Sequence, residues 1–148
     1  MISTREAVPE DIPDIMAIER LSFASPWSES GFMNEIKKPY SISLVGVAEK
    51  HVVGYIIAWY VTDEIHIANL AVHPEYRCHG IAGILVNRVI GQCTRAVWIG
   101  LEVRRSNTAA RALYGKLGFS EIGVRKGYYE AEGEDALIMA RTLNGRED

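Results

Sequence analysis

The amino-acid sequence predicts a mixed α/β fold, in which a seven-stranded and mostly antiparallel sheet is flanked by about four helices. Three observations support this prediction. Apolar residues recur at helical spacing in some segments and at strand spacing in others, and three strand-like segments follow one another with short connections. A helical segment then separates the third of these strands from the next one, which predicts that the two central strands pair in parallel.

The first part of the chain contains two expected helices and the strands around them. Pro9 opens a helix whose apolar residues recur at helical spacing, and Pro26 breaks the chain before a second helix. Ser28 is the expected N-cap of this second helix, which Lys38-Pro39 ends. Short connections predict that the last three strands of this part form an antiparallel meander. The strands are expected at 2–7, 40–48, 52–61 and 65–72.

The second part of the chain alternates helices and strands. The expected elements are a helix at 81–93, a strand at 96–103, a helix at 107–117 and strands at about 119–125 and 135–140. Gly118 ends the second of these helices. The sequence holds no internal repeat and no interdomain linker, so we expect a single domain over residues 1–148.

Composition narrows the class of protein. The 148 residues are 48% hydrophobic, which supplies one substantial core. A net charge of −3 and a pI of about 5.8 argue against a nucleic-acid binder. No segment approaches the roughly 20 apolar residues that cross a bilayer, and the N-terminus lacks the pattern of a secretory signal. We therefore expect a cytoplasmic protein that binds neither nucleic acid nor membrane, and we favour a monomer.

The cysteines and histidines show no pattern of a disulfide framework or a metal site. Cys78 and Cys93 are too few for either, and the four histidines lack the H-E-x-x-H spacing. Cys93 falls on the apolar face of an expected helix, so it is expected to be buried. A catalytic role for the Cys78 thiol is disfavoured, because no His and Asn or Asp are recognisably placed to serve it. We expect no metal.

The connection from the strand at 65–72 to the helix at 81–93 is the strongest candidate for a binding site. The N–H groups of a first helical turn have no partner within the helix, and the aligned peptide dipoles favour an anion there. Gly80 allows close approach of a ligand, and Arg77 and His79 add donors. The pattern predicts a pyrophosphate site, and the alternative is an ordinary connection with a capping glycine.

Arg77-x-x-Gly80-x-Ala82 resembles the acetyl-CoA signature of the GNAT superfamily of N-acetyltransferases, (Q/R)-x-x-G-x-(G/A). The expected order of elements resembles that superfamily over nearly the whole chain. The resemblance implies the GNAT fold, a cofactor cleft at the two parallel strands and acetyl-CoA as the co-substrate. Cys78-His79 departs from the longer polar or basic residues common in the family, which we expect to weaken CoA binding. The residues expected to bind acetyl-CoA are Leu70, Ala71, Val72, Arg77, Cys78, His79, Gly80, Ile81, Ala82 and Asn107.

Glu102 is the only charge in the strand at 97–103, which is expected to lie inside the sheet. A carboxylate in such surroundings is costly unless it is paired or functional. The resemblance implies that Glu102 is the general base. The alternative is a purely structural ion pair with one of three arginines, namely Arg104, Arg105 or Arg125.

Tyr114 follows Asn107 by seven residues, so both side chains point from one face of the last helix. Tyr114 stands in a Leu-Tyr-x-x-Leu-Gly-Phe motif at 113–119. The resemblance implies that Tyr114 is the general acid and that Asn107 contacts the CoA arm. The alternatives are a packing aromatic and a helix cap.

The free energy needed to deprotonate an amine favours one kind of acceptor. An α-amine needs only about 1 kcal/mol to become neutral at pH 7, whereas a lysine side chain needs about 4.6 kcal/mol. A carboxylate base that acts through a water is better matched to a protein N-terminus. We expect direct attack on acetyl-CoA, with backbone N–H groups at 70–72 polarising the thioester carbonyl.

Three segments resemble the acetyltransferases that modify the N-terminal alanine of small-subunit ribosomal protein eighteen. They are F-x-x-P-W-S at 23–28, L-E-V-R-x-S-N-x-x-A at 101–110, and G-Y-Y at 127–129 with G-E-D-A at 133–136. The second of these is also shared with the catalytic subunits of protein N-terminal acetyltransferases in general. The resemblance implies this protein substrate, with Trp27 and a loop carrying Tyr128 and Tyr129 as its binding residues. The acidic residues Glu130, Glu132, Glu134 and Asp135 would suit its basic first residues.

Two other functions stay open. One is a broad-range protein N-terminal acetyltransferase, because the motifs common to that group outnumber the ones peculiar to the alanine acetyltransferases. The other is a non-catalytic module that senses CoA. The presence of both Glu102 and Tyr114 counts against the second.

Overall fold

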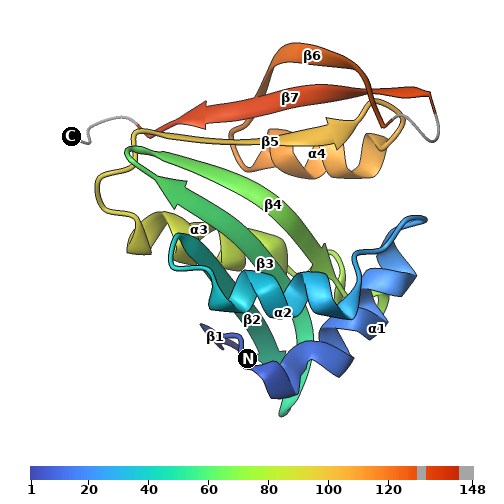
Figure 1. Ribbon diagram of the computed structural model, residues 1–148, viewed down its shortest axis with the longest axis vertical. Helices are drawn as coiled ribbons and strands as arrows, with labels where there is room; N and C mark the ends of the chain where they lie inside the picture. The colour runs from blue at the N-terminus through green and yellow to red at the C-terminus, as the bar shows by residue number, and fades with distance from the viewer. Residues whose placement is uncertain (130–132, 144–148) are drawn as a thin grey trace. The chain divides into compact units, whose positions relative to one another are not determined.

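The computed structural model describes residues 1–129 and 133–143, and its elements follow the predicted order (Figure 1). The strands are β1 (Ile2–Glu6), β2 (Ser41–Ala48), β3 (His51–Val61), β4 (Glu64–Val72), β5 (Trp98–Arg104), β6 (Ser120–Tyr129) and β7 (Glu134–Thr142). The helices are α1 (Ile12–Ser22), α2 (Glu29–Lys37), α3 (Ile81–Gln92) and α4 (Thr108–Lys116), with 3-10 turns η1 (Pro9–Asp11) and η2 (Pro74–Tyr76). The predicted mixed α/β class is confirmed.

The strands form one seven-stranded sheet in the order β1-β2-β3-β4-β5-β7-β6. The pairs β1–β2, β2–β3, β5–β7 and β6–β7 are antiparallel. β4 and β5 pair in parallel, with Glu64 opposite Trp98 and His66 opposite Gly100. This parallel pair is the one predicted from the helix between the two strands. As a result of the pairing, His66 in β4 and Glu102 in β5 lie on neighbouring strands.

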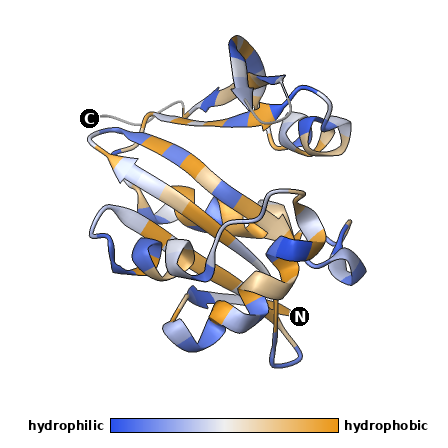
Figure 2. Cartoon of the chain, turned by 45° about the vertical axis from the view of Figure 1, so that its right-hand side comes forward, coloured by the Kyte–Doolittle hydropathy of each residue, from blue (hydrophilic) through white to orange (hydrophobic). Residues whose placement is uncertain are grey.

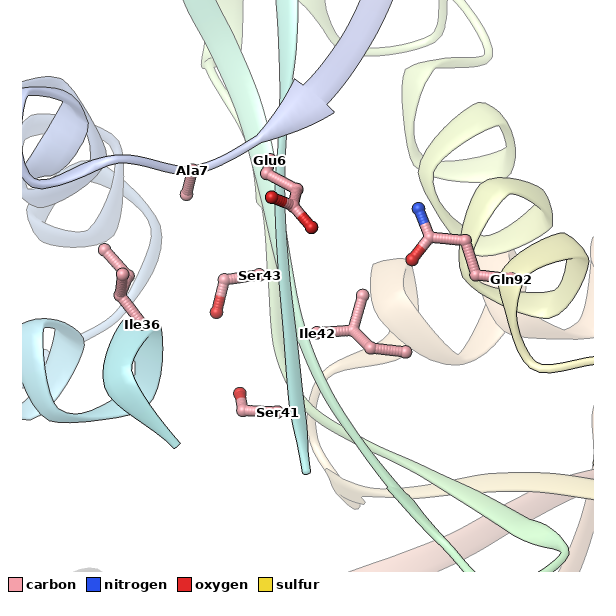
Figure 3. A pocket seen from close by; sticks show the side chains of 7 residues that line it. All are labelled: Glu6, Ala7, Ile36, Ser41, Ile42, Ser43 and Gln92. Carbon is pink, nitrogen blue, oxygen red and sulfur yellow. The ribbon is translucent and has the colours of Figure 1, made fainter. Parts of the chain in front are cut away.

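The chain divides into two compact units, and the first comprises residues 1–61 and 67–94. In this unit α1 and α2 lie on one face of the strands and α3 lies on the other (Figure 3). β3 is apolar along most of its length because both of its faces are covered, and Figure 2 shows apolar residues along the strands of this unit. The core on the α1 and α2 face includes Ile12, Ile15, Ile18, Phe32, Tyr55 and Ile57.

The second unit comprises residues 62–66 and 95–148. β5, β7 and β6 pair side by side, and α4 follows β5 along the chain. The indole of Trp98 lies over Gly100 on β5, and a Cβ at position 100 would fall 2.2 Å from a ring carbon of Trp98. Gly100 therefore provides the space that the tryptophan ring occupies.

One expectation about the chain's end is wrong. Tyr128 and Tyr129 were expected in a loop, but they are the last two residues of β6. The reason is that β6 and β7 are longer than expected, since Tyr129 still pairs with Glu134 across the hairpin. Gly127 has a φ of 64° and lies where the register shifts, which lets the strand resume after an irregular step.

No helix in residues 1–129 and 133–143 combines the length and the apolar composition needed to cross a membrane.

Candidate active site

The turn that the sequence singled out runs from the end of β4 to the start of α3. Gly80 is the N-cap of α3 and has a left-handed φ of 78°, and Cys78 has a positive φ of 66°. Gly80 has no side chain to cap the first turn, and beyond its chain neighbours and the adjoining helix backbone no atom lies within 4 Å of the position that its Cβ would take. The first-turn N–H groups of α3 are thereby left available to an anion.

Arg77 and His79 are engaged within the turn and with α1. Arg77 donates from Nε to the Val72 carbonyl at 3.0 Å and from Nη2 to the Ser22 hydroxyl at 3.2 Å. The Nδ1 of His79 lies 2.8 Å from the Arg77 carbonyl, so that nitrogen carries the hydrogen. These two side chains hold the shape of the turn, in addition to the donor role predicted for them.

The other residues predicted to bind acetyl-CoA differ in whether their side chains are exposed. Ala71, Ile81 and Ala82 are buried, so their contribution to a ligand would come from the backbone. Cys78 is exposed, whereas Cys93 is buried in accordance with the prediction. This distribution suits a site that holds a diphosphate mainly through peptide N–H groups.

Glu102 lies in β5 of the second unit, and its side chain is 13% exposed. Its Oε2 lies 2.6 Å from Nε2 of His66, and its Oε1 lies 3.6 Å from Nη1 of Arg125. The hydrogen bond from His66 lowers the pKa of Glu102, and this effect outweighs burial, which raises it. Glu102 is therefore a carboxylate at neutral pH. Of the three arginines considered from the sequence, Arg125 is the one that contacts it.

His66 is the site residue that the sequence did not reveal. Strand alternation places a polar residue between buried Ile65 and Ile67, but alternation alone does not say what that residue faces. The contact depends on the β4–β5 register, which pairs His66 with Gly100 and so brings the imidazole to Glu102. The His66–Glu102 contact could have been predicted only from the exact register of the parallel pair, which the sequence does not specify.

Asn107 and Tyr114 lie seven residues apart, at the start and toward the end of α4. Asn107 is the N-cap, and its Oδ1 accepts the N–H of Ala110 at 3.0 Å, so the helix-cap interpretation is confirmed. Tyr114 is 7% exposed and packs against Phe119 with ring centroids 5.6 Å apart. Burial raises the pKa of Tyr114, so the phenol is protonated at neutral pH.

Tyr129 is the last residue of β6 and is partly buried. Its pKa is raised by burial, and the charge of Glu102 adds to that shift. The pKa of Tyr114 is raised chiefly by burial, and Tyr129 adds to that shift. The guanidinium of Arg104 lies 4.0 Å from the centroid of the Tyr129 ring. Both Tyr114 and Tyr129 are therefore protonated at neutral pH.

Tyr128 and Trp27 complete the predicted substrate residues. Tyr128 is exposed, and its ring meets that of Tyr129 edge-on with centroids 5.1 Å apart. Trp27 lies in the first unit, partly buried against the core on the α1 and α2 face. Exposed or half-buried aromatic rings of this kind offer apolar contact to a bound peptide.

The acidic residues expected to attract a basic peptide are engaged with neighbouring groups. Glu134 accepts the N–H of Ser106 at 2.6 Å and lies 3.6 Å from Arg104. Asp135 accepts the N–H of Gly127 and lies 3.8 Å from Arg105. Glu130 and Glu132 lie outside the described residues. The arginines partly offset the negative charge on which that expectation relied.

A pocket of about 140 Å³ lies at the edge of β2 in the first unit (Figure 3). Its lining residues are Glu6, Ala7, Ile36, Ser41, Ile42, Ser43 and Gln92. None of the predicted site residues lines it. In the part of the chain that the structure describes, no three His, Cys, Asp or Glu side chains gather to hold a metal.

Residues 12–119 match the model of the acetyltransferase (GNAT) family. This segment is most of the chain, so the chain belongs to that family. It is an N-acetyltransferase that takes its acetyl group from acetyl-CoA, as the resemblance of the turn to the family signature implied.

Individual relatives narrow the comparison. A ribosomal protein bS18-alanine N-acetyltransferase from Salmonella typhimurium is 40% identical over 138 residues, which cover 90% of this chain and 93% of the relative. An N-alpha-acetyltransferase from Saccharolobus solfataricus is 37% identical over 154 residues, with 94% and 92% coverage. The crystal structure of the ribosomal-protein-S18-alanine N-acetyltransferase from Escherichia coli has a TM-score of 0.86 and 33% identity, covering 97% of this chain and 94% of that one. The predicted GNAT fold is confirmed.

Proposed function

We propose that this chain transfers the acetyl group of acetyl-CoA to the N-terminal α-amine of a protein, and that its substrate is the N-terminal alanine of ribosomal protein bS18, as in RimI enzymes. The observation that carries the proposal is the similarity, over 90% or more of the chain, to proteins named for this reaction. The F-x-x-P-W-S segment at 23–28 supports the same substrate. We place this activity in the cytoplasm.

Glu102 is the proposed general base, and its environment supports a mild one. A carboxylate with a lowered pKa remains ionised at neutral pH, but it accepts a proton weakly. An α-amine loses its proton for only about 1 kcal/mol at pH 7, so a weak base that acts through a water is sufficient. His66 is then a positioning residue, because its hydrogen bond fixes the Glu102 carboxylate and keeps it charged.

Removal of His66 is expected to change the pH dependence of catalysis. Without the hydrogen bond that lowers it, the pKa of Glu102 rises, so the base becomes protonated at a higher pH. In His66→Ala the acidic limb of the kcat/KM profile should therefore move to higher pH. His51→Ala, an exposed histidine at the start of β3, is the control and should leave the profile in place. An unshifted limb in His66→Ala would refute the coupling.

Tyr114 is the proposed general acid for the departing thiolate. Its raised pKa keeps the phenol protonated, as a proton donor requires. A free thiol has a pKa near 8.5 and a free phenol near 10, so complete transfer between the free groups is uphill by about 2 kcal/mol, and the raised pKa of Tyr114 makes it more so. Tyr114 would act chiefly through a hydrogen bond to the developing charge on sulfur. The amine attacks directly, with no covalent enzyme intermediate.

The turn before α3 fits the diphosphate of acetyl-CoA. The open space at Gly80 and the uncapped first turn supply peptide N–H donors without a Cβ in the way. Backbone N–H groups at Leu70, Ala71 and Val72 would polarise the thioester carbonyl, and Asn107 would contact the CoA arm. Acetyl-CoA supplies the activated acetyl group, and these residues orient it.

A side chain at Gly80 is expected to weaken CoA binding. In Gly80→Val a β-branched residue must adopt a left-handed φ, which costs roughly 1–2 kcal/mol, and its methyl groups enter the space beside the first-turn N–H groups. Calorimetry should show a Kd for CoA at least about tenfold higher. Gly91→Ala, within the same helix, is the control and should bind CoA normally. Equal affinities in Gly80→Val and the unsubstituted protein would contradict the proposed site.

A broad-range protein N-terminal acetyltransferase is the second candidate, favoured by the similarity to the N-alpha-acetyltransferase from Saccharolobus solfataricus. A panel of peptides with free N-termini, incubated with acetyl-CoA and followed by mass spectrometry, distinguishes the two. Preference for peptides that begin Ala-Arg supports the bS18 assignment. Equal acetylation of peptides that begin with Ser or Met-Leu supports the broad-range enzyme. Binding of CoA without acetylation of any peptide would indicate a CoA-sensing module.

A further inference from the structure

Glu19, near the end of α1, buries a carboxylate in the first unit with 1% of the residue exposed. Three donors from three segments hold it. The N–H of Trp27 donates to Oε2 at 2.8 Å, and the Nδ2 of Asn69 donates to Oε1 at 2.9 Å. The hydroxyl of Tyr55 also donates to Oε1. One carboxylate thus joins the α1–α2 connection to β3 and to β4.

Aromatic packing also connects Trp27 to Tyr55, through Phe32. The ring of Trp27 packs on that of Phe32 with centroids 5.1 Å apart, and Phe32 meets Tyr55 edge-on at 5.6 Å. Tyr55 then donates to Glu19, which accepts the backbone N–H of Trp27. Both the backbone and the side chain of Trp27 are therefore fixed by groups that lead back to Glu19.

The charge on Glu19 is not needed for core packing. A buried carboxylate carries a desolvation penalty of several kcal/mol, and well-packed apolar residues often stabilise a core as well or better. What a carboxylate adds is two oxygens that accept several hydrogen bonds in defined directions. Burial and the Glu19 carboxylate raise the pKa of Tyr55, so its phenol remains a donor. The arrangement serves to fix geometry.

The end of α1 also contacts the segments proposed to hold acetyl-CoA. Asn69, which donates to Glu19, directly precedes the backbone donors at 70–72. Ser22, three residues after Glu19, accepts a hydrogen bond from Arg77 in the turn before α3. The last turns of α1 are thus tied to Trp27 on one side and to the acetyl-CoA segments on the other.

We propose that Glu19 is a positioning residue for the peptide substrate, which holds the α1–α2 connection and Trp27 in a fixed position against β4. Glu19 acts through Trp27 and does not touch the reacting atoms. The inference rests on the proposed N-terminal acetyltransferase function.

Glu19→Gln tests the proposal because it keeps the size of the side chain while turning one acceptor into a donor. The new NH₂ group must face at least one of the three existing donors, so the α1–α2 connection loosens. We expect the KM for an Ala-Arg peptide to rise about tenfold or more and by a larger factor than the KM for acetyl-CoA, with kcat within about twofold of the unsubstituted enzyme. Tyr55→Phe, which removes a single donor and retains the ring, should shift the peptide KM in the same direction by a smaller factor.

Asp11→Asn is the matched control. Asp11 is a second buried carboxylate at the opposite end of α1, held by Arg5 at 2.7 Å and by the N–H of Val8 at 2.8 Å. This variant should lower the melting temperature and leave the peptide KM unchanged. Hydrogen exchange, measured by mass spectrometry, should accelerate in residues 23–28 for Glu19→Gln and not for Asp11→Asn.

The possible outcomes distinguish a failure of the proposed role of Glu19 from a failure of the proposed acetyltransferase function. An enzyme that acetylates the peptide, but whose peptide KM stays within about twofold in both Glu19→Gln and Tyr55→Phe, overturns the role of Glu19 alone. Equal changes in kcat and in both KM values would indicate a merely structural role and overturn it too. If the unsubstituted protein acetylates no peptide at all, the proposed function fails and takes this inference with it. Should Glu19→Gln not fold, Tyr55→Phe decides the question.

Discussion

Glu102→Gln is expected to lower turnover by roughly 10² to 10⁴, the range in which loss of a general base falls. The amide has nearly the same shape as the carboxylate, but it cannot accept the proton of the attacking amine. It also loses the charge that faces His66 and Arg125. Steady-state acetylation of an Ala-Arg peptide, followed by mass spectrometry, measures the effect.

The controls for Glu102→Gln separate catalysis from binding. Calorimetry with CoA should give an unchanged Kd, because the proposed diphosphate site lies in the turn before α3. Glu121→Gln removes a carboxylate of the same unit that pairs with Arg111 at 2.8 Å, and it should leave turnover unaltered. Unchanged turnover in Glu102→Gln would exclude Glu102 as the base.

Tyr114→Phe is expected to lower kcat by a smaller factor, roughly 10 to 100. The phenol stabilises developing charge on sulfur through a hydrogen bond, and loss of one such donor typically costs about 1.5–3 kcal/mol. The ring remains, so its packing against Phe119 and the stability of α4 should persist. The measurement is kcat under saturating acetyl-CoA, together with the melting temperature.

Phe119→Leu provides the packing control for Tyr114→Phe. It loosens the aromatic contact while keeping the hydroxyl. The melting temperature should therefore fall, while kcat should stay close to that of the unsubstituted enzyme. A Tyr114→Phe enzyme with full activity would leave Tyr114 as a packing residue, the alternative considered from the sequence.

The sequence predicted most of the architecture because its signals are local. Ser28 was expected as a cap, and a cap was the alternative considered for Asn107; each accepts a backbone N–H at the start of its helix. The parallel β4–β5 pair followed from the helix that separates the two strands in the sequence. The single-domain expectation remains a prediction.

What the sequence could not predict depends on register and on side-chain geometry between distant segments. The His66–Glu102 contact requires the exact alignment of β4 with β5, and a shift of one residue would turn His66 to the other face. The donors to Glu19 come from positions up to 50 residues away in sequence. Tyr128 and Tyr129 were expected in a loop because the family resemblance implied one, whereas β6 continues through both residues.

The stacking of Trp98 on Gly100 restricts the paths by which this sequence can evolve. Any residue larger than glycine at position 100 would have to displace the indole, since its Cβ would fall within 2.2 Å of the ring. Shrinking the tryptophan first would remove that obstacle, so the order in which the two positions mutate matters. We expect natural variants to retain glycine there wherever tryptophan stands two residues earlier.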